Sequence, residues 1–160
     1  MKKLLAILLA ALMLLCFAAC GEDNNSTDSA ASTTSATGSE TEENTVEKTG
    51  VWADAVLLKD TTVGEGEKTI KVEISAEKQV ITLTVKTNAE TVGAALLENE
   101  IIEGEDSEFG LYVKKVNGIT ADFDVNKAYW AFYVDGSYAS SGVDTTTIDE
   151  DVTYKLEYTK

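Results

Sequence analysis

Acidic side chains at alternate positions are the chain's best-spaced candidates for metal chemistry. In the segment DFDVNK, Asp122, Asp124 and Asn126 have the spacing that opens a calcium-binding loop. Such a loop also needs a glycine next and a bidentate glutamate at its end, but Lys127 and Tyr133 stand at these two positions. The segment therefore predicts an Asp-rich loop between two strands, and we expect no metal site.

Catalytic groups are scarce. The chain has no histidine and no arginine, and its two cysteines both lie within the first 20 residues. The serine–histidine and cysteine–histidine mechanisms therefore lack a base. Carboxylate pairs remain possible, but 28 acidic residues produce chance pairs, and we expect the run EGEDSEFG (103–110) to be a solvated loop. We expect a protein that is not an enzyme and that has no cofactor.

The densest chemical feature is the stretch YWAFYVDGSYASSGVD (129–144), which holds five of the chain's twelve aromatic residues. In a strand over 129–134, Trp130, Phe132 and Val134 share one face, and Tyr129, Ala131 and Tyr133 share the other. One face can fill a core, and the other keeps two tyrosines, which are amphipathic and common at contact surfaces. Two interpretations stay open: both faces are buried, or one aromatic row lines a binding surface.

Alternating patterns predict the strands that position this stretch. KTIKVEIS (68–75) and VITLTVK (80–86) alternate and are joined by the short connection AEKQ, which predicts a hairpin. LYVKKV (111–116) and ITADF (119–123) flank Asn117-Gly118, and Asp135-Gly136 follows the aromatic strand; both pairs are hairpin signals. VTYKLEY (152–158) predicts a final strand, with Val152, Tyr154, Leu156 and Tyr158 on one face.

One segment has helical spacing. TNAETVGAALLENEII (87–102) predicts a helix of nine to eleven residues, capped by a Thr87–Glu90 capping box or directly by Thr91. Gly93 weakens the helix by about 1 kcal/mol relative to alanine, but lets it approach a sheet closely. A hairpin, one helix and further strands predict an α+β fold: a small β-grasp-like domain with a mixed sheet and one helix packed across it.

The N-terminus has the pattern of a lipoprotein signal. Lys2 and Lys3 precede an apolar run from Leu4 to Ala19, which is short for a bilayer span. The run ends in FAAC, where small residues precede Cys20; this resembles a bacterial lipobox. We expect residues 1–19 to be removed, Cys20 to carry lipid, and the protein to be anchored to the cell membrane, facing outward.

A polar segment separates this anchor from the domain. Residues 21–50 are rich in Ser, Thr, Glu and Asn and have one large aliphatic side chain, Val46, so we expect residues 20–50 to form a disordered linker. The predicted domain is then 51–160. The net charge of −15 makes nucleic acid an unfavourable partner. Lipid therefore has to supply the membrane attachment.

Residues 68 to 160 resemble the transcobalamin-like C-terminal domain family of secreted or lipid-anchored bacterial modules. The motifs that carry the resemblance are TVGAAL, GLYVKKVNGI, AYWAFYVDG, SGVD and the final YKLEY. The family is similar to the β-rich domain that closes over a corrinoid in animal cobalamin carriers, where a helical barrel holds the other side. No such barrel is visible in this sequence, so the resemblance implies half of a corrinoid cage.

The resemblance also implies site residues. Tyr129 and Trp130 match the ligand-side strand, and Ser140, Ser141, Gly142 and Val143 match the ligand-facing loop. Together with Tyr133 from the aromatic strand, these are the candidate ligand-binding residues. One hypothesis is that the module captures a small ligand, with cobalamin as a candidate, for a membrane importer or a partner protein. The alternative is a cell-surface domain that docks a protein or glycan without a small-molecule pocket.

Overall fold

The computed structural model describes residues 44–160. Its helices are η1 (Gly50–Asp54, a 3-10 helix), α1 (Val92–Glu98) and α2 (Phe123–Asn126). Its strands are β1 (Thr61–Gly64), β2 (Lys68–Ala76), β3 (Gln79–Thr87), β4 (Ile102–Ser107), β5 (Gly110–Val116), β6 (Ile119–Thr120), β7 (Tyr129–Val134), β8 (Ser137–Tyr138) and β9 (Thr153–Thr159).

Six strands form a mixed sheet in the order β1-β3-β2-β9-β7-β8. β2 pairs with β3 and β7 with β9 in antiparallel fashion, while β1–β3 and β2–β9 are parallel. The alternating residues expected to face inward in β2 and β3 are buried: Ile70, Val72, Ile74, Ile81, Leu83 and Val85. The α+β class with a mixed sheet and one main helix is therefore confirmed.

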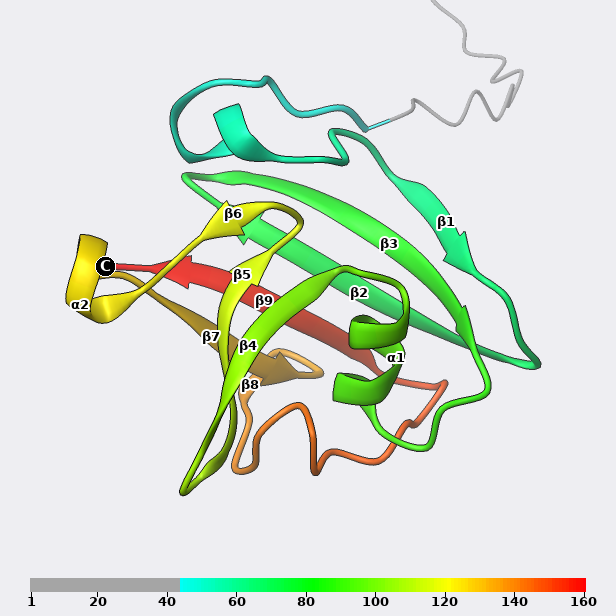
Figure 1. Ribbon diagram of the computed structural model, residues 1–160. Helices are drawn as coiled ribbons and strands as arrows, with labels where there is room; N and C mark the ends of the chain where they lie inside the picture. The colour runs from blue at the N-terminus through cyan, green and yellow to red at the C-terminus, as the bar shows by residue number, and fades with distance from the viewer. Residues whose placement is uncertain (1–43) are drawn as a thin grey trace, which may run out of the picture. The chain divides into compact units, whose positions relative to one another are not determined.

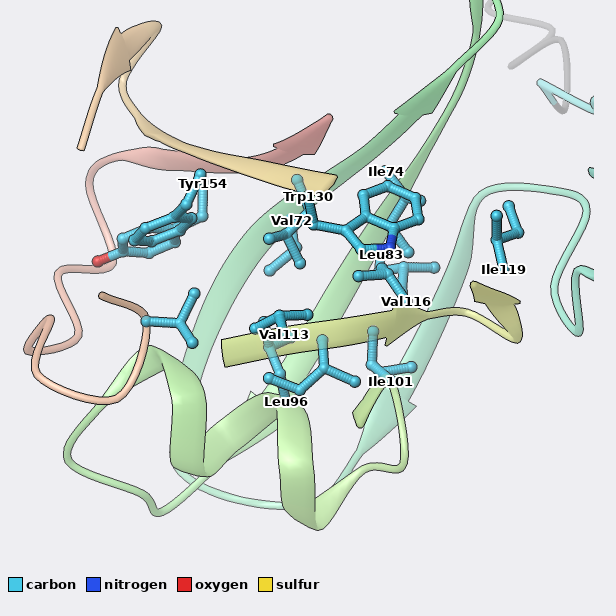
Figure 2. Close-up of a cluster of buried hydrophobic side chains, with 14 of the residues drawn as sticks. Val72, Ile74, Leu83, Leu96, Ile101, Val113, Val116, Ile119, Trp130 and Tyr154 are labelled. Carbon is cyan, nitrogen blue, oxygen red and sulfur yellow. The ribbon is translucent and has the colours of Figure 1, made fainter. Parts of the chain in front are cut away.

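A second layer covers one face of this sheet. It consists of α1 and a three-stranded sheet in the order β4-β5-β6, which lie in front of the larger sheet in Figure 1. Leu96 and Ile101, which flank the end of α1, and Val113 and Val116 of β5 belong to the same buried cluster as Trp130 (Figure 2). The core therefore lies between the two layers.

Both dipeptide turns form as expected. Asn117 and Gly118 have φ of 50° and 82° and join β5 to β6, and Asp135 and Gly136 have φ of 48° and 76° and join β7 to β8. Positive φ at both central positions belongs to the type I′ turn, whose twist matches that of paired strands. These two local signals therefore fixed two hairpins.

The acidic run was expected to be a loop, and that prediction is wrong. Ile102–Ser107 form β4, which pairs antiparallel with β5, with a register shift between Glu103 and Gly104. In β4 only Ile102 is buried and the five residues that follow are exposed. An edge strand needs backbone pairing rather than apolar side chains, so polar composition did not reveal it.

The helix is shorter than expected, at seven residues. Thr91 caps it directly, because its Oγ1 accepts a hydrogen bond from the backbone N–H of Ala94 at 3.3 Å. The alternative capping box does not form: the hydroxyl of Thr87 donates to Glu98 instead and ties the helix to β3. DFDVNK, expected to be a loop, contains the single turn α2, capped by Asp122.

The ordered domain begins before the expected boundary at residue 51. Val46 is buried, and its backbone N–H donates to the carbonyl of Leu58 at 2.7 Å. Trp52 is fully buried and its Nε1 donates to the carbonyl of Ala76 at 3.0 Å. Residues 44–50 therefore pack with the domain, although their composition matches that of the linker.

The remaining N-terminal predictions lie outside the described residues. They are the signal peptide (1–19), the lipidated Cys20 and the linker up to residue 43. Within residues 44–160, the helices are too short and too polar for any of them to cross a membrane.

Candidate functional site

An aromatic groove of about 650 Å³ is the candidate site. Four parts of the chain line it: the β4–β5 hairpin, strand β7, the segment from β8 to Thr145, and β9 through Leu156. The lining residues are Phe109, Leu111, Tyr112, Val113, Tyr129, Trp130, Phe132, Tyr138, Ala139, Ser140, Ser141, Gly142, Val143, Thr145 and Leu156. This volume lies within the usual range for small-ligand sites, about 300–1,000 Å³.

Strand β7 supplies one wall and connects it to the core. Trp130 and Phe132 are each 8% exposed, whereas Tyr129 is 36% exposed. The ring of Trp130 meets Tyr158 edge-on at 5.6 Å between centroids, and Phe132 stacks on Tyr154 at 6.2 Å. These aromatic pairs hold the wall rigid, while a margin of each ring still reaches the groove.

The β4–β5 hairpin supplies the opposite wall. Phe109 at its tip is 94% exposed, although phenylalanine is usually buried. The tip is shaped by Ser107, whose hydroxyl donates to the carbonyl of Gly110 at 2.6 Å and accepts from the N–H of Phe109 at 3.2 Å. The hairpin thus presents an aromatic ring that no core contact explains.

The loop 139–145 closes one end of the groove and is fixed by α1. The backbone N–H of Gly93 donates to the carbonyl of Val143 at 2.7 Å. A β-carbon at Gly93 would lie 2.8 Å from the backbone of Asp144, which is closer than side chains tolerate. Gly93 therefore lets the helix approach this loop, and not a sheet as the sequence suggested.

The structure brings together six of the seven candidate ligand residues. Tyr129 and Trp130 of β7 and Ser140, Ser141, Gly142 and Val143 of the loop all line the groove. The seventh, Tyr133, lies elsewhere: its ring meets Tyr138 edge-on at 5.4 Å and lies under the Nζ of Lys155 at 4.3 Å. Side chains alternate along β7, so Tyr133 shares the face opposite Trp130 with Tyr129. Tyr129, at the start of the strand, still lines the groove, whereas Tyr133 does not.

Sequence reasoning missed the hairpin wall. Phe109, Leu111, Tyr112 and Val113 line the groove, but the acidic residues around Phe109 made that region look like a solvated loop. An isolated phenylalanine within an acidic run was the available signal, because an exposed large apolar side chain needs an explanation.

The groove itself carries no charged side chain among the described residues, although the whole chain has a net charge of −15. Its polar groups are hydroxyls and backbone atoms, with Ser140, Ser141 and Thr145 exposed at the loop. Lys155 and Glu157 of β9 lie outside the groove, where the carboxylate of Glu157 accepts a hydrogen bond from Lys155 at 2.5 Å and raises the pKa of that lysine. The groove thus suits an uncharged ligand.

Two buried polar atoms have no hydrogen-bond partner in the described part of the chain: Nε1 of Trp130 and Oδ1 of Asp144. The indole of Trp130 lies among Leu83, Val116 and Ile74 in Figure 2, so its N–H belongs to the core side of β7. Burying an unpaired donor or acceptor costs free energy. Both atoms lie in the residues that frame the groove.

The candidate calcium ligands have other roles. Asp122 caps α2 by accepting from the N–H of Asp124 at 2.9 Å, and its other oxygen lies 3.2 Å from Nζ of Lys114. This contact holds the pKa of Asp122 below its ordinary value and raises the pKa of Lys114, where a second contact to Glu105 at 2.8 Å contributes most. Residues 44–160 contain no cluster of three or more metal-ligating side chains.

A second concavity of about 680 Å³ lies between the segment 56–63, the end of α1 and the β4–β5 sheet. Its exposed apolar residues are Val56 and Leu97, and the ion pair between Lys115 and Glu103 lies at its edge. It gathers none of the candidate ligand residues, so the aromatic groove remains the candidate site.

Comparison with known proteins finds a family model that matches the same segment of the chain. The family model described as "Domain of unknown function (DUF4430)" matches residues 89–160, which include every lining residue of the groove. Comparison with curated proteins gives no match. The resemblance to transcobalamin-like domains is compatible with this match and stays a prediction.

Two solved structures resemble this chain to different degrees. A protein from Ruminococcus gnavus ATCC 29149, described as a candidate metal-binding protein, is 24% identical with a TM-score of 0.55; the alignment covers 59% of this chain and 98% of that one. Haptocorrin in complex with Cbi is 18% identical with a TM-score of 0.45, covering 61% of this chain and 26% of haptocorrin. The first likeness establishes a shared fold, and at this identity nothing more.

Proposed function

We propose that this protein is a lipid-anchored binding module, without catalytic activity, that captures a small uncharged ligand in its aromatic groove outside the cell. The observation that carries the proposal is the groove itself: six aromatic residues and a Gly/Ser loop meet around about 650 Å³ without a charged side chain. In so acidic a chain, an uncharged lining favours ring-bearing ligands that stack and accept a few hydrogen bonds.

A corrinoid is the ligand to test first. The sequence likeness to transcobalamin-like domains supports it, and so do the loop hydroxyls of Ser140 and Ser141, which can bond the amide groups around a corrin ring. The ring system is too large for the groove to enclose. We therefore expect one side of the ligand to be held here, with an affinity on the order of micromolar or about −8 kcal/mol.

Anchoring completes the proposed function. Lipid on Cys20 would hold the module at the outer face of the membrane, and a segment of roughly 20 residues before Asn44 would let it reach a membrane importer or a partner protein. Such a partner could cover the open side of the ligand. The net charge of −15 on this protein makes nucleic acid an unfavourable partner.

Fluorescence tests the proposal. A Trp52→Phe variant of the full chain leaves Trp130 as the only tryptophan, and cobinamide bound in the groove should quench the tryptophan emission. Gly142→Leu should weaken binding, because it fills the groove and its only close neighbour is the movable side chain of Asp144. Ser137→Leu, outside the lining, is the matched control.

After correction for cobinamide absorbance, emission that stays flat into the millimolar range, together with no heat in calorimetry, would remove the corrinoid from this proposal. Equal weakening by Gly142→Leu and Ser137→Leu would show that binding occurs away from the groove.

The alternative function, docking of a protein or glycan, has its own support. Phe109 is 94% exposed and Tyr138 is 65% exposed, so the groove is open at its mouth and its aromatic surface extends beyond the cavity. Contact with a macromolecule would bury both rings.

A further inference from the structure

Strand β7 has an open backbone edge beside the groove. β8 pairs only with Tyr133 and Val134, and one further bond joins the N–H of Ala139 to the carbonyl of Phe132 at 2.9 Å. Beyond that point no strand of the described chain pairs with this edge of β7. The larger sheet therefore ends here on β7 over most of its length.

Two hydrogen bonds establish which backbone groups face the open side. The N–H of Asp135 donates to Thr153, at the start of β9, whereas the carbonyl of Phe132 accepts from Ala139 on the β8 side. Because backbone groups of successive strand residues point to alternate sides, Trp130 directs its N–H and carbonyl to the same side as Phe132. These groups lie next to the groove that Trp130 lines.

This edge differs from the other sheet edges in residues 44–160. β4 carries Glu103, Glu105 and Asp106, β6 has only two residues, and β1 has only four and ends at Gly64. Charge and shortness are the usual protections of an edge against pairing with another chain. β7, with the sequence YWAFYV, has neither protection: it holds no charged residue and no proline.

We propose that this edge is a docking site for an extended peptide segment of a partner protein, which adds a strand to β7 and places alternate side chains in the aromatic groove. This inference rests on the proposed function of the groove as a binding surface. It names the kind of partner for the alternative in which the groove docks a protein. Strand addition obtains affinity from backbone pairing and specificity from pockets for every second side chain.

Charge complementarity determines the peptide's chemistry. The groove has no charged lining residue, so the side chains that enter it should be apolar or aromatic. The hairpin wall carries Glu105, Asp106 and Glu108, all exposed, on a chain of net charge −15. The partner segment should therefore alternate β-branched or aromatic residues and carry lysine or arginine at its ends.

Selection from a random dodecapeptide display library against the intact chain in detergent micelles tests the proposal. Enriched peptides should lack proline, alternate apolar residues and have basic ends. A synthetic copy of the strongest binder should slow amide hydrogen exchange at Trp130 at least tenfold. N-methylation of one alternating set of its amides should weaken binding at least tenfold, and methylation of the other set should not.

Protein variants locate the contact. Ser141→Arg places a bulky cation in the groove and should weaken the peptide at least tenfold, whereas Ser75→Arg on β2 should leave binding unchanged. No enriched peptide, or a binder that is indifferent to both methylated sets and leaves Trp130 exchange unaltered, would overturn the inference.

The outcomes separate this inference from the small-ligand function. Cobinamide binding without peptide binding leaves the small-ligand function in place and removes strand addition. Peptide binding without cobinamide binding supports strand addition and removes the small-ligand function. The absence of both removes the groove as a binding surface.

Discussion

Asn117 offers a quantitative test of how the domain is held together. Its side chain spans 60 residues of sequence: Oδ1 accepts from the N–H of Leu57 and Nδ2 donates to the carbonyl of Leu57, each at 2.8 Å. Its backbone makes two more hydrogen bonds. The N–H of Asn117 donates to the carbonyl of Ile101 at 2.7 Å, and the carbonyl of Asn117 accepts from the N–H of Val56 at 3.0 Å. Asn117 is 2% exposed, so water cannot replace these partners.

Asn117→Ala should be strongly destabilising. Two lost hydrogen bonds are worth about 0.5–1.5 kcal/mol each, and Leu57 keeps a donor and an acceptor that are partly shielded from water. The positive φ of 50° adds about 1 kcal/mol for alanine. The total is about 3–4 kcal/mol, which should lower the melting temperature by roughly 10–20 °C.

Asp135→Ala is the matched control. Asp135 has nearly the same φ, 48°, at the equivalent position of the other type I′ turn, and its side chain is exposed. This variant should show the backbone term alone, about 1 kcal/mol. Thermal unfolding followed by circular dichroism measures both variants. Equal losses would refute the argument, because the amide bridge to Leu57 would then contribute nothing.

Four further experiments test other parts of the molecule. Gly93→Ala should lower the melting temperature, because the added β-carbon would lie 2.8 Å from the backbone of Asp144. This clash should outweigh the helix preference of alanine over glycine, which is about 1 kcal/mol. A rise in melting temperature would contradict that contact. The pKa of Asp122 in the folded protein lies below its ordinary value, so the ion pair with Lys114 stabilises the fold above about pH 4. This stabilisation is lost as the pH falls through the pKa of the folded state. Acid titration of the stability should show the loss in the wild type but not in Asp122→Asn. Millimolar calcium should shift the melting temperature little, since Asp122 is already engaged by Lys114, and a large shift reversed by chelator would make it a ligand. Cys20→Ala should abolish labelling by radioactive palmitate, and label retained in that variant would disprove the lipobox.

The sequence by itself determined the local elements of this domain. Alternation placed Ile70, Val72 and Ile74 on a buried face, because a strand repeats every two residues. Asn117-Gly118 and Asp135-Gly136 determined two hairpins, since those residues tolerate the positive φ that a type I′ turn requires. Thr91 as a helix cap was likewise among the local predictions.

The sequence also placed six candidate residues that meet in the groove, but it did so in two different ways. The aromatic strand pointed to Tyr129 and Trp130, which the family resemblance matched to a ligand-side strand, and the loop from Ser140 to Val143 came only from that resemblance. Tyr133 lies outside the groove, although it shares its face of β7 with Tyr129. Alternation alone does not separate these two tyrosines, and only the tertiary packing around β7 shows which of them lines the groove.

Only the tertiary structure decided the pairings between distant segments. β9 enters between β2 and β7, β1 joins β3 in parallel, and the acidic run becomes β4. Each depends on backbone hydrogen bonds, which any side chain permits, so composition carries little signal of them. The groove has the same origin: Phe109 and Trp130 are 21 positions apart in the sequence, and they line one cavity because the β4–β5 hairpin packs over the edge of the larger sheet.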